Sequence, residues 1–160
     1  MTKEKIPTTP AILTLRAQKV DFTLHPYPYE ERGGTERAAS KLGVDEHCVI
    51  KTLVMEDEAG KPLIILMHGD KEVSTKSLAR AIGTKSVSPC NPAVAEKHTG
   101  YKVGGTSPFG TKKVMPVYME QTITDLPGIF INAGSRGLLA QMSSSELIRI
   151  LKPVFVSVAI

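Results

Sequence analysis

The sequence has few of the features that mark secreted, membrane-bound or metal-binding proteins. Only two of the 160 residues are cysteines, so Cys48 and Cys90 fit reduced thiols better than a disulfide framework. No apolar run approaches the roughly twenty residues of a membrane span, and the first residues lead into no signal-peptide core. We therefore expect a cytoplasmic protein that does not cross a membrane.

Motifs of the common catalytic sites are missing as well. The four histidines lack the spacing of zinc ligands, and the chain has no Cys-x-x-Cys pair. It also has no Gly-x-Ser-x-Gly nucleophile elbow, no Walker phosphate loop and no dinucleotide-binding fingerprint. We expect no metal and no cofactor, and an enzyme of this kind would orient its substrate more than supply an acid–base pair.

Charge of neither sign dominates the chain. Lys and Arg number 20 against 16 Asp and Glu, which gives a net charge of +4. This mild excess is compatible with a polyanionic partner. The only adjacent basic pair, Lys112-Lys113, follows a glycine-rich loop, and it is either a phosphate-contacting rim or a solvated loop edge.

Helix and strand patterns alternate along the chain. Capping residues, prolines and glycines predict helices that begin at Pro10, after Thr35, at Ser74 or Thr75, after Asn91-Pro92, and after the capping box Ser143-Ser144-Ser145-Glu146. Apolar alternation predicts strands at 22–25, 48–55, 62–68, 114–119, 128–132 and 154–159. The many short strands and tight turns predict one mixed α/β domain over 1–160 with a curled sheet.

One predicted strand carries a lysine among apolar residues. Strand alternation puts Lys51 on the same face as Val49 and Leu53, and Thr52 on the opposite face. Burying an ammonium group is costly unless it is paired or meets a ligand. Lys51 therefore either extends its ammonium to the edge of the sheet or points into a polar cavity and binds something there.

A second unusual segment lies about fifty residues downstream, at Gly104-Gly105-Thr106-Ser107-Pro108-Phe109-Gly110. Glycines allow positive φ and close approach of a ligand, and Pro108 makes the turn rigid. Backbone N–H groups freed in this way can bind a carbonyl, a carboxylate or a phosphate. The spacing alone fits a tight surface turn better, but together with Lys51 it predicts a pocket.

Two prolines confine another segment to an extended loop or a sheet edge. Pro26 and Pro28 alternate with Tyr27 and Tyr29 just after a predicted strand. The tyrosines are then free to line a site, or they only pack against the fold.

Three segments in a specific order and spacing carry a resemblance to a known family. They are Leu42-Gly43 with Val-Ile-Lys-Thr-Leu-Val at 49–54, Thr-Gly-Tyr-Lys-Val-Gly-Gly-Thr-Ser-Pro-Phe-Gly at 99–110, and Gly-Ser-Arg-Gly-Leu at 134–138. Over about 9–158 the chain resembles the YbaK/EbsC family, the free-standing relatives of the editing domain inserted in bacterial prolyl-tRNA synthetases. The resemblance implies a single-domain α/β fold with a mixed, barrel-like sheet flanked by short helices.

The resemblance also implies a function, which is removal of a wrong amino acid from a tRNA. The branch that this chain resembles most deacylates Cys-tRNA(Pro), with Cys-tRNA(Cys) as a further candidate substrate. In that branch the substrate's own thiol attacks its ester carbonyl and releases a cyclic thiolactone, so the protein positions the ester and stabilises charge on the carbonyl oxygen. The implied partners are the mischarged tRNA and prolyl-tRNA synthetase, without a metal, a cofactor or a membrane.

Site residues follow from the resemblance position by position. Lys51 matches the family's functional lysine and would hold the terminal phosphate or ribose region of the tRNA as a point charge. Gly104 matches the loop whose backbone amides would face the aminoacyl ester, and these two are the catalytic candidates. The substrate-binding candidates are Tyr27, Thr52, Gly105, Thr106, Ser107, Pro108 and Asn132.

Three positions depart from the cysteinyl-specific pattern. Gly34 stands in place of an aromatic residue, Asn132-Ala133-Gly134 in place of Ser-Gly-Gly, and Leu139 in place of a polar residue. All three are expected near the amino-acid pocket, so the identity of the amino acid stays open. The alternatives are an Ala-tRNA(Pro) deacylase that uses water, and a non-catalytic module that binds a nucleotide or an RNA 3′ end.

Overall fold

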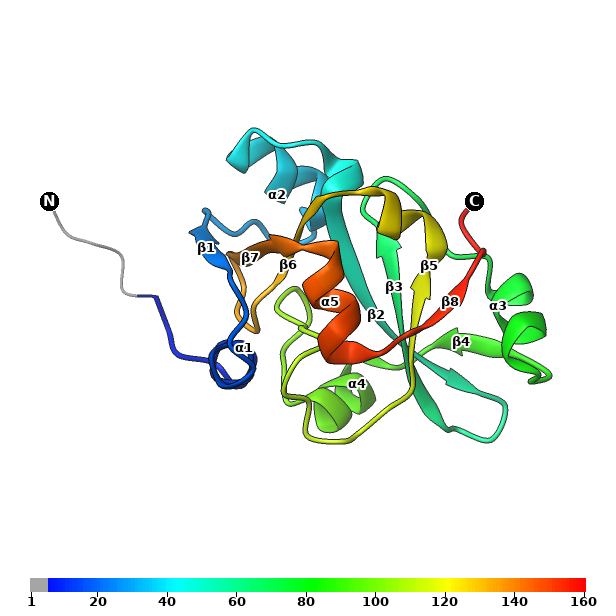
Figure 1. Ribbon diagram of the computed structural model, residues 1–160. Helices are drawn as coiled ribbons and strands as arrows, with labels where there is room; N and C mark the ends of the chain where they lie inside the picture. The colour runs from blue at the N-terminus through cyan, green and yellow to red at the C-terminus, as the bar shows by residue number, and fades with distance from the viewer. Residues whose placement is uncertain (1–5) are drawn as a thin grey trace, which may run out of the picture.

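An eight-stranded mixed sheet organises the protein, whose computed structural model describes residues 6–160 (Figure 1). The strands are β1 (Thr23–Pro26), β2 (Val49–Asp57), β3 (Pro62–His68), β4 (Val87–Pro89), β5 (Val117–Glu120), β6 (Gly128–Asn132), β7 (Leu138–Ser143) and β8 (Val154–Val156). The helices are α1 (Pro10–Ala17), α2 (Gly34–Leu42), α3 (Thr75–Ile82), α4 (Pro92–Thr99) and α5 (Ser144–Leu151), with 3₁₀ turns η1 (Glu46–Cys48) and η2 (Gln121–Asp125). Residues 1–5, where the sequence predicts no signal peptide, lie outside the described part.

The strand order confirms the predicted mixed sheet. It runs β1-β7-β6-β2-β3-β5-β8, and β4 pairs with the far end of β2. The β2–β3 hairpin and the β1–β7 and β6–β7 pairs are antiparallel, whereas β2–β6, β3–β5 and β5–β8 are parallel. None of the helices in residues 6–160 is long and apolar enough to span a bilayer.

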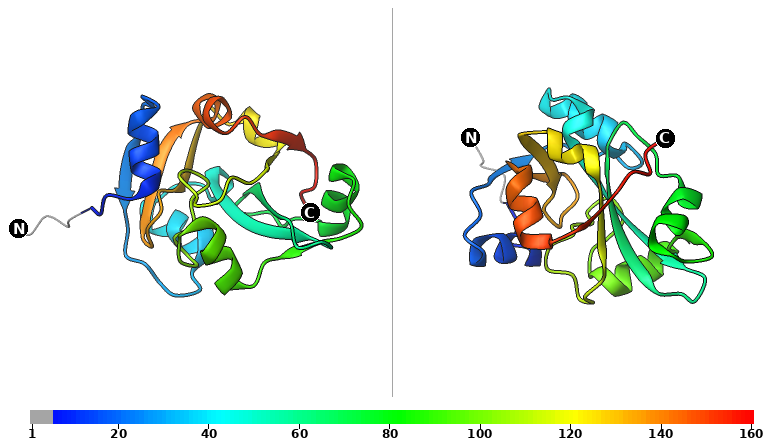
Figure 2. Two further views of the ribbon diagram at one scale, coloured as in Figure 1. Left: turned by 90° about the horizontal axis from the view of Figure 1, so that it is seen from below. Right: turned by 45° about the vertical axis from the view of Figure 1, so that its right-hand side comes forward.

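Helices cover both sides of the curled sheet. The left view of Figure 2 shows α5 and α2 on opposite sides of the strands. The α5 side holds the largest core, where residues of α1 and α5 pack on alternate residues of β2 and β3. On the other side, α3 covers one part of the sheet and α2 another, so two smaller cores lie next to each other there.

Most helix ends lie where the sequence predicts them. The hydroxyls of Thr9, Ser74 and Ser143 accept the predicted capping hydrogen bonds from main-chain N–H groups, at 3.1, 3.2 and 3.2 Å. The prediction that Thr35 caps α2 is wrong. The cap residue is Gly33, and the Thr35 hydroxyl donates to the Glu46 carboxylate at 2.8 Å.

The strand predictions need several corrections. The short strand β4 was not predicted, and β8 ends at Val156 rather than Ala159. Strand β7 was not predicted, because Leu138–Ser143 is rich in residues that also favour helices. Cys48 belongs to η1 rather than to the lysine strand, because the Asp45 carboxylate accepts from the His47 N–H at 3.0 Å and closes a tight turn. Strand β5 begins at Val117 rather than Val114.

Candidate functional site

Lys51 lies in a row of side chains that crosses three strands. Strands β2 and β6 run in parallel up to the pair of Ile50 and Ile131, so the next residues, Lys51 and Asn132, lie side by side on the same face. Asn132 in turn pairs with Leu139 of β7. This row faces the side of the sheet on which α2 packs against Leu139.

The Lys51 ammonium is neither unpaired in the core nor free in solvent. It donates to the carbonyl oxygen of Lys71 at 2.8 Å and to Glu72 Oε1 at 3.2 Å. The Lys51 side chain is 19% exposed, whereas that of Glu72 is 78% exposed. Glu72 is therefore a surface partner that a substrate anion could displace, while the carbonyl belongs to the main chain.

Asn132 connects this row to the glycine loop. Its Nδ2 donates to the carbonyl oxygens of Gly104 at 3.2 Å and Ser135 at 3.1 Å. Its Oδ1 accepts from the N–H groups of Gly134 at 2.7 Å and Ser135 at 3.2 Å. Three of these bonds stay within the turn between β6 and β7, and the fourth ties that turn to Gly104, so Asn132 fixes Gly104 relative to the end of β6.

At two positions of the loop, close contacts leave room only for glycine. Gly104 has a φ of +87°, and a Cβ there would lie 2.5 Å from the Tyr29 hydroxyl oxygen. A Cβ on Gly105 would lie 2.8 Å from the main-chain nitrogen of Arg136. The Arg136 Nε donates to the Val103 carbonyl at 2.8 Å, and its guanidinium lies 5.3 Å from the centroid of the Tyr29 ring. Gly104 itself is exposed, so its backbone can be reached from solvent.

The remainder of the loop is anchored in the protein. Thr106 is half-buried, but Ser107 and Pro108 are buried. The Ser107 hydroxyl accepts from the Phe109 N–H at 3.2 Å, and the Tyr101 hydroxyl donates to the Phe109 carbonyl at 2.6 Å. Burial raises the pKa of Tyr101 to about 12, so this phenol stays neutral as a donor. The side chains of Ser107 and Tyr101 therefore hold the glycine loop on its buried side.

The last two predicted residues, Tyr27 and Thr52, lie in different surroundings. Tyr27 packs in the core under α2, and its N–H donates to the Gly137 carbonyl at 2.9 Å. Burial, and then the neighbouring Tyr29, raise the pKa of the Tyr27 phenol, although a hydrogen bond to the backbone of Gly137 opposes this. The Thr52 hydroxyl is buried and has no hydrogen-bond partner within the described residues. As predicted, Thr52 belongs to the face opposite Lys51.

The structure therefore places Asn132 beside Lys51 by strand register and joins it to Gly104 by a hydrogen bond. The sequence analysis missed Arg136 and the Lys71 carbonyl as parts of this arrangement. Arg136 lies inside the family-like segment 134–138, so its position was a usable signal. Nothing in the sequence indicates that the main chain at Lys71 returns to β2.

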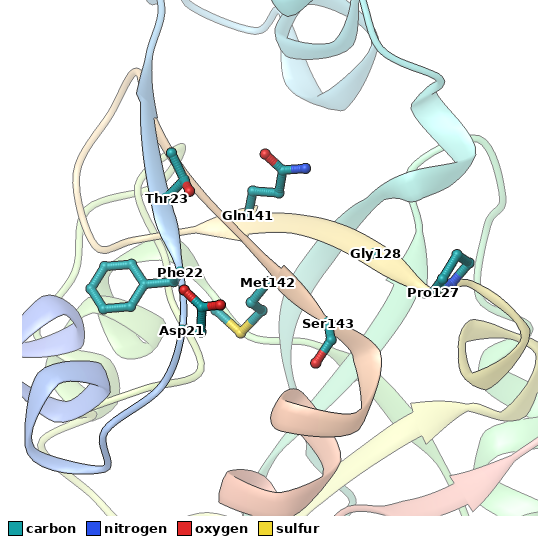
Figure 3. Close-up of a pocket in the computed structure, with 8 residues that line it drawn as sticks. All are labelled: Asp21, Phe22, Thr23, Pro127, Gly128, Gln141, Met142 and Ser143. Atoms are coloured by element: carbon teal, nitrogen blue, oxygen red, sulfur yellow. The ribbon is translucent and has the colours of Figure 1, made fainter.

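Two hollows lie away from these residues. One of about 290 Å³ lies where β6 begins and β7 ends, with Thr23, Gln141 and Ser143 among its lining residues (Figure 3). Another of about 470 Å³ lies between α3 and the segment that leads into β4. Neither is lined by a predicted site residue, since Asn132 and Gly104 lie at the other end of the β6–β7 pair.

Metal-binding residues do not gather in this part of the protein. Over residues 6–160, no group of three His, Cys, Asp or Glu side chains is arranged to hold a metal ion. The cysteines Cys48 and Cys90 are both free thiols.

A family comparison decides the assignment. A sequence model described as the aminoacyl-tRNA editing domain matches residues 30–150, which include the lysine strand, the glycine loop and the β6–β7 turn. This chain belongs to the aminoacyl-tRNA editing domain family. The resemblance identified in the sequence is thereby confirmed.

Three curated proteins show where related editing domains occur. The EbsC protein of Enterococcus faecalis, proposed to be a Cys-tRNA(Pro)/Cys-tRNA(Cys) deacylase, is 28% identical over 94% of this chain and 92% of its own. The YwhH protein of Bacillus subtilis is 27% identical over 70% of this chain and 71% of its own. The proline–tRNA ligase of Thermodesulfovibrio yellowstonii is 27% identical over 79% of this chain but only 21% of the ligase.

Solved structures confirm the predicted fold of the editing domain. A proposed trans-editing enzyme for prolyl-tRNA synthetase aligns with a TM-score of 0.82 at 18% identity, over 96% of this chain and 98% of that one. The hypothetical protein APE2540 aligns with a TM-score of 0.86 at 22% identity, over 95% of this chain and 100% of that one.

Proposed function

We propose that this editing domain, over residues 1–160, cleaves the ester bond between a wrong amino acid and a tRNA. The first candidate substrate is Cys-tRNA(Pro), and the second is Cys-tRNA(Cys). The name of EbsC and the match to a proline–tRNA ligase support this substrate class. The observation that carries the proposal is that Asn132, which follows the residue paired with the one before Lys51, bonds to the Gly104 carbonyl. This arrangement places the Lys51 cation near the exposed backbone of Gly104. The cation suits the phosphate of a tRNA end, and the backbone N–H suits the carbonyl oxygen of the aminoacyl ester.

The proposed reaction uses the thiol of the substrate. The cysteine sulfur attacks the ester carbonyl carbon, a C–S bond forms, and the bond from that carbon to the ribose oxygen breaks. The thiol proton passes to the ribose oxygen, so the products are a cyclic thiolactone and a tRNA with a free hydroxyl. No group of the protein gains or loses a proton overall, which agrees with the lack of an acid–base motif in the sequence.

In this proposal the protein positions the reacting atoms. Lys51 binds the phosphate or ribose region of the tRNA end when that anion displaces Glu72 from the ammonium. Backbone N–H groups at Gly104 and Thr106 bind the carbonyl oxygen as charge develops on it, whereas the Gly105 N–H shapes the loop by donating to the Lys102 carbonyl at 2.8 Å. Removing one such donor from an oxyanion site typically lowers turnover by about 10²- to 10³-fold.

The other predicted residues have supporting parts in the proposal. The buried residues Ser107 and Pro108 keep the glycine loop rigid. Asn132 holds Gly104 of that loop near Lys51. Tyr27, whose phenol is kept neutral by burial, lines the part of the site under α2 that would hold the amino acid of the substrate. The Thr52 hydroxyl is the one buried side-chain polar atom, among those of the described residues, without a partner. It lies on the face opposite Lys51, so its part is indirect, through the strand that carries Lys51.

A second candidate function follows from the apolar residue in the row. Leu139 is 4% exposed and packs with Ala38 and Ala39 of α2, whereas the cysteinyl-specific pattern has a polar residue there. At Gly34, the first residue of α2, an added Cβ would meet nothing within 4 Å, although the φ of +60° would strain any side chain there. An apolar lining discriminates small side chains by only about 1–3 kcal/mol per methylene. Removal of alanine from Ala-tRNA(Pro) by water attack is therefore the alternative substrate choice.

The proposed partners are the mischarged tRNA and prolyl-tRNA synthetase, and the proposed location is the cytoplasm, where translation takes place. The net charge of +4 gives the tRNA a mild attraction rather than a strong one. We expect binding of the acceptor stem to weaken as salt is added, because each neutralised phosphate releases counterions. A salt-independent affinity would contradict this part.

The activity test uses purified protein with Cys-tRNA(Pro) and Ala-tRNA(Pro) in separate reactions. We expect the wild type to remove at least one aminoacyl group, and Lys51→Ala to lower kcat/KM by about 10²-fold while folding normally. Arg149→Ala is the matched control, because Arg149 also pairs with a glutamate, Glu146, but lies on α5 at the opposite side of the sheet. If folded Lys51→Ala deacylated at the wild-type rate, Lys51 would have no role in substrate binding or catalysis. Binding of RNA without loss of either ester would favour the non-catalytic module.

A further inference from the structure

We propose that His47 and Asp70 are positioning residues for Lys51, and that they act through the turn Gly69-Asp70-Lys71-Glu72, here called the anchor turn. The anchor turn supplies the Lys71 carbonyl oxygen and the Glu72 carboxylate that receive the lysine ammonium. The inference rests on the proposed function of Lys51, but it makes a structural claim that can be tested without activity.

The side chain of His47 holds the anchor turn at Asp70. The His47 Nδ1 lies 2.8 Å from Asp70 Oδ1, so the ring donates a hydrogen bond to the carboxylate. Burial raises the pKa of Asp70, but the hydrogen bond and charge of His47, helped by the backbone at Asp70 and the charge of His68, outweigh it and lower that pKa overall. Asp70 is thus an anion at neutral pH and a strong acceptor for His47.

The ring of His47 is itself fixed in place by His68. The two imidazoles stack with centroids 3.8 Å apart and planes 6° apart. His68 is 1% exposed, and its Nδ1 lies 2.9 Å from the His47 carbonyl oxygen. Because a carbonyl only accepts, Nδ1 carries a proton, and Nε2 bonds to the Thr122 hydroxyl at 2.7 Å. His47 therefore has a single defined orientation toward Asp70.

The two ends of the anchor turn are also fixed. A Cβ on Gly69 would lie 2.6 Å from the Val49 carbonyl oxygen, so the main chain passes against β2 where only glycine fits. At the other end, the Glu72 N–H donates to the Ile160 carbonyl at 3.1 Å, and the Ile160 N–H donates back at 2.9 Å. The Lys71 carbonyl lies between these fixed points, and its oxygen is aimed at Lys51 Nζ.

The other charged groups at this end of the sheet have partners of their own. Asp45 accepts from the His47 N–H at 3.0 Å, and Glu46 accepts from the Thr35 hydroxyl at 2.8 Å. Burial, and then the charges of Asp45 and Asp70, raise the pKa of the Cys48 thiol, so it stays neutral. Of the residues that face His47, Asp70 is the carboxylate that bonds its ring.

A long lysine side chain needs such an anchor to act as a defined point charge, because its four-carbon chain is flexible. The exposed Glu72 carboxylate cannot provide it alone, since it is free to leave when a substrate anion arrives. The fixed carbonyl keeps the ammonium in place during that exchange. Loss of His47 or Asp70 would free the middle of the anchor turn between its fixed ends, so that the Lys71 carbonyl and the ammonium it holds shift away from Asn132 and the glycine loop.

The experiment compares His47→Ala, His47→Asn and Arg149→Ala in the full-length protein. Asparagine has an Nδ2 donor close to the place of the histidine Nδ1, so it should restore the bond to Asp70. We follow the Lys51 side-chain signal by NMR, the fraction folded, and kcat and KM for Cys-tRNA(Pro). We expect His47→Ala to shift the Lys51 signal and to raise KM by about 10- to 100-fold, as for a misplaced group, with kcat nearly unchanged because a phosphate contact is uniform binding. His47→Asn should restore most of both, and Arg149→Ala should change neither.

An unchanged Lys51 signal in folded His47→Ala would overturn the proposal, as would a signal that moves equally in Arg149→Ala. If His47→Ala does not fold, Asp70→Ala and Asp70→Asn give the same comparison, because asparagine keeps an acceptor oxygen. If the wild type lacks deacylase activity, the NMR signal still decides whether His47 positions Lys51. Failure of the proposed function and failure of this inference are therefore distinct results.

Discussion

Replacing Gly104 with alanine perturbs the proposed ester-binding loop at its tightest point. The residue has a φ of +87°, where an alanine is strained, typically by about 1–2 kcal/mol. The new Cβ would also lie 2.5 Å from the Tyr29 hydroxyl oxygen and 3.0 Å from two ring carbons, whereas ordinary contact begins at 3.4 Å. Either the loop or the tyrosine must therefore move by about 1 Å.

The size of the effect follows from these two terms. Overpacking of this kind typically costs about 1–3 kcal/mol in addition to the backbone strain, so we expect the free energy of unfolding to fall by about 2–5 kcal/mol. A displacement of about 1 Å in a positioning group lowers kcat/KM by about 10²-fold. Tyr29 cannot simply rotate away without losing the guanidinium of Arg136 that lies against its ring.

Urea unfolding and deacylation of Cys-tRNA(Pro) measure the two effects. Tyr29→Ala removes the atoms that the new Cβ would meet, so the double variant Gly104→Ala/Tyr29→Ala should recover the packing term and keep only the backbone strain. The double variant should therefore be less destabilised than the two single changes together. Wild-type stability and activity in Gly104→Ala would refute the account of the loop.

Two further predictions concern residues around that loop. Asn132→Asp replaces two donated bonds with a carboxylate facing the carbonyl oxygens of Gly104 and Ser135, so we expect stability to fall by about 1–3 kcal/mol and deacylation to fall with it; unchanged urea unfolding and activity would count against the role of Asn132. Tyr101, whose pKa burial raises to about 12, favours folding in its neutral form, so its contribution is complete below the unfolded pKa of about 10 and disappears as the pH rises through about 12. Tyr101→Phe should therefore lose less unfolding free energy over that pH interval than the wild type, and equal losses would show that the phenol is not responsible.

Local chemistry explains which parts of the fold the sequence could predict. The caps at Thr9, Ser74 and Ser143 depend on residues three positions away; Thr9 and Ser143 were predicted correctly, and Ser74 was one of two predicted candidates. Thr35 looked like a cap for the same reason, but a tertiary contact to Glu46 takes its hydroxyl. Strand β7 was missed because its pairing with β6, rather than its own composition, makes it a strand.

The candidate site divides in a similar way. Lys51 and the glycine loop were identifiable because each is unusual within its own segment, an isolated cation in one and clustered glycines in the other. The bond from Asn132 to Gly104 spans 28 residues of sequence, and the bond from Lys51 to the Lys71 carbonyl involves a main-chain atom that no residue type reveals. Contacts of this kind depend on strand order and on a turn, so only the structure shows them.

The measurement that tests the central claim most directly is loss of the aminoacyl bond from Cys-tRNA(Pro) and from Ala-tRNA(Pro) in the presence of the purified protein. The account predicts rapid loss of the cysteinyl group with release of a thiolactone, and a large reduction in Lys51→Ala but not in Arg149→Ala. Loss of alanine alone would move the protein to the water-dependent reaction. Stability of both esters with folded protein and bound tRNA would contradict the proposed deacylase.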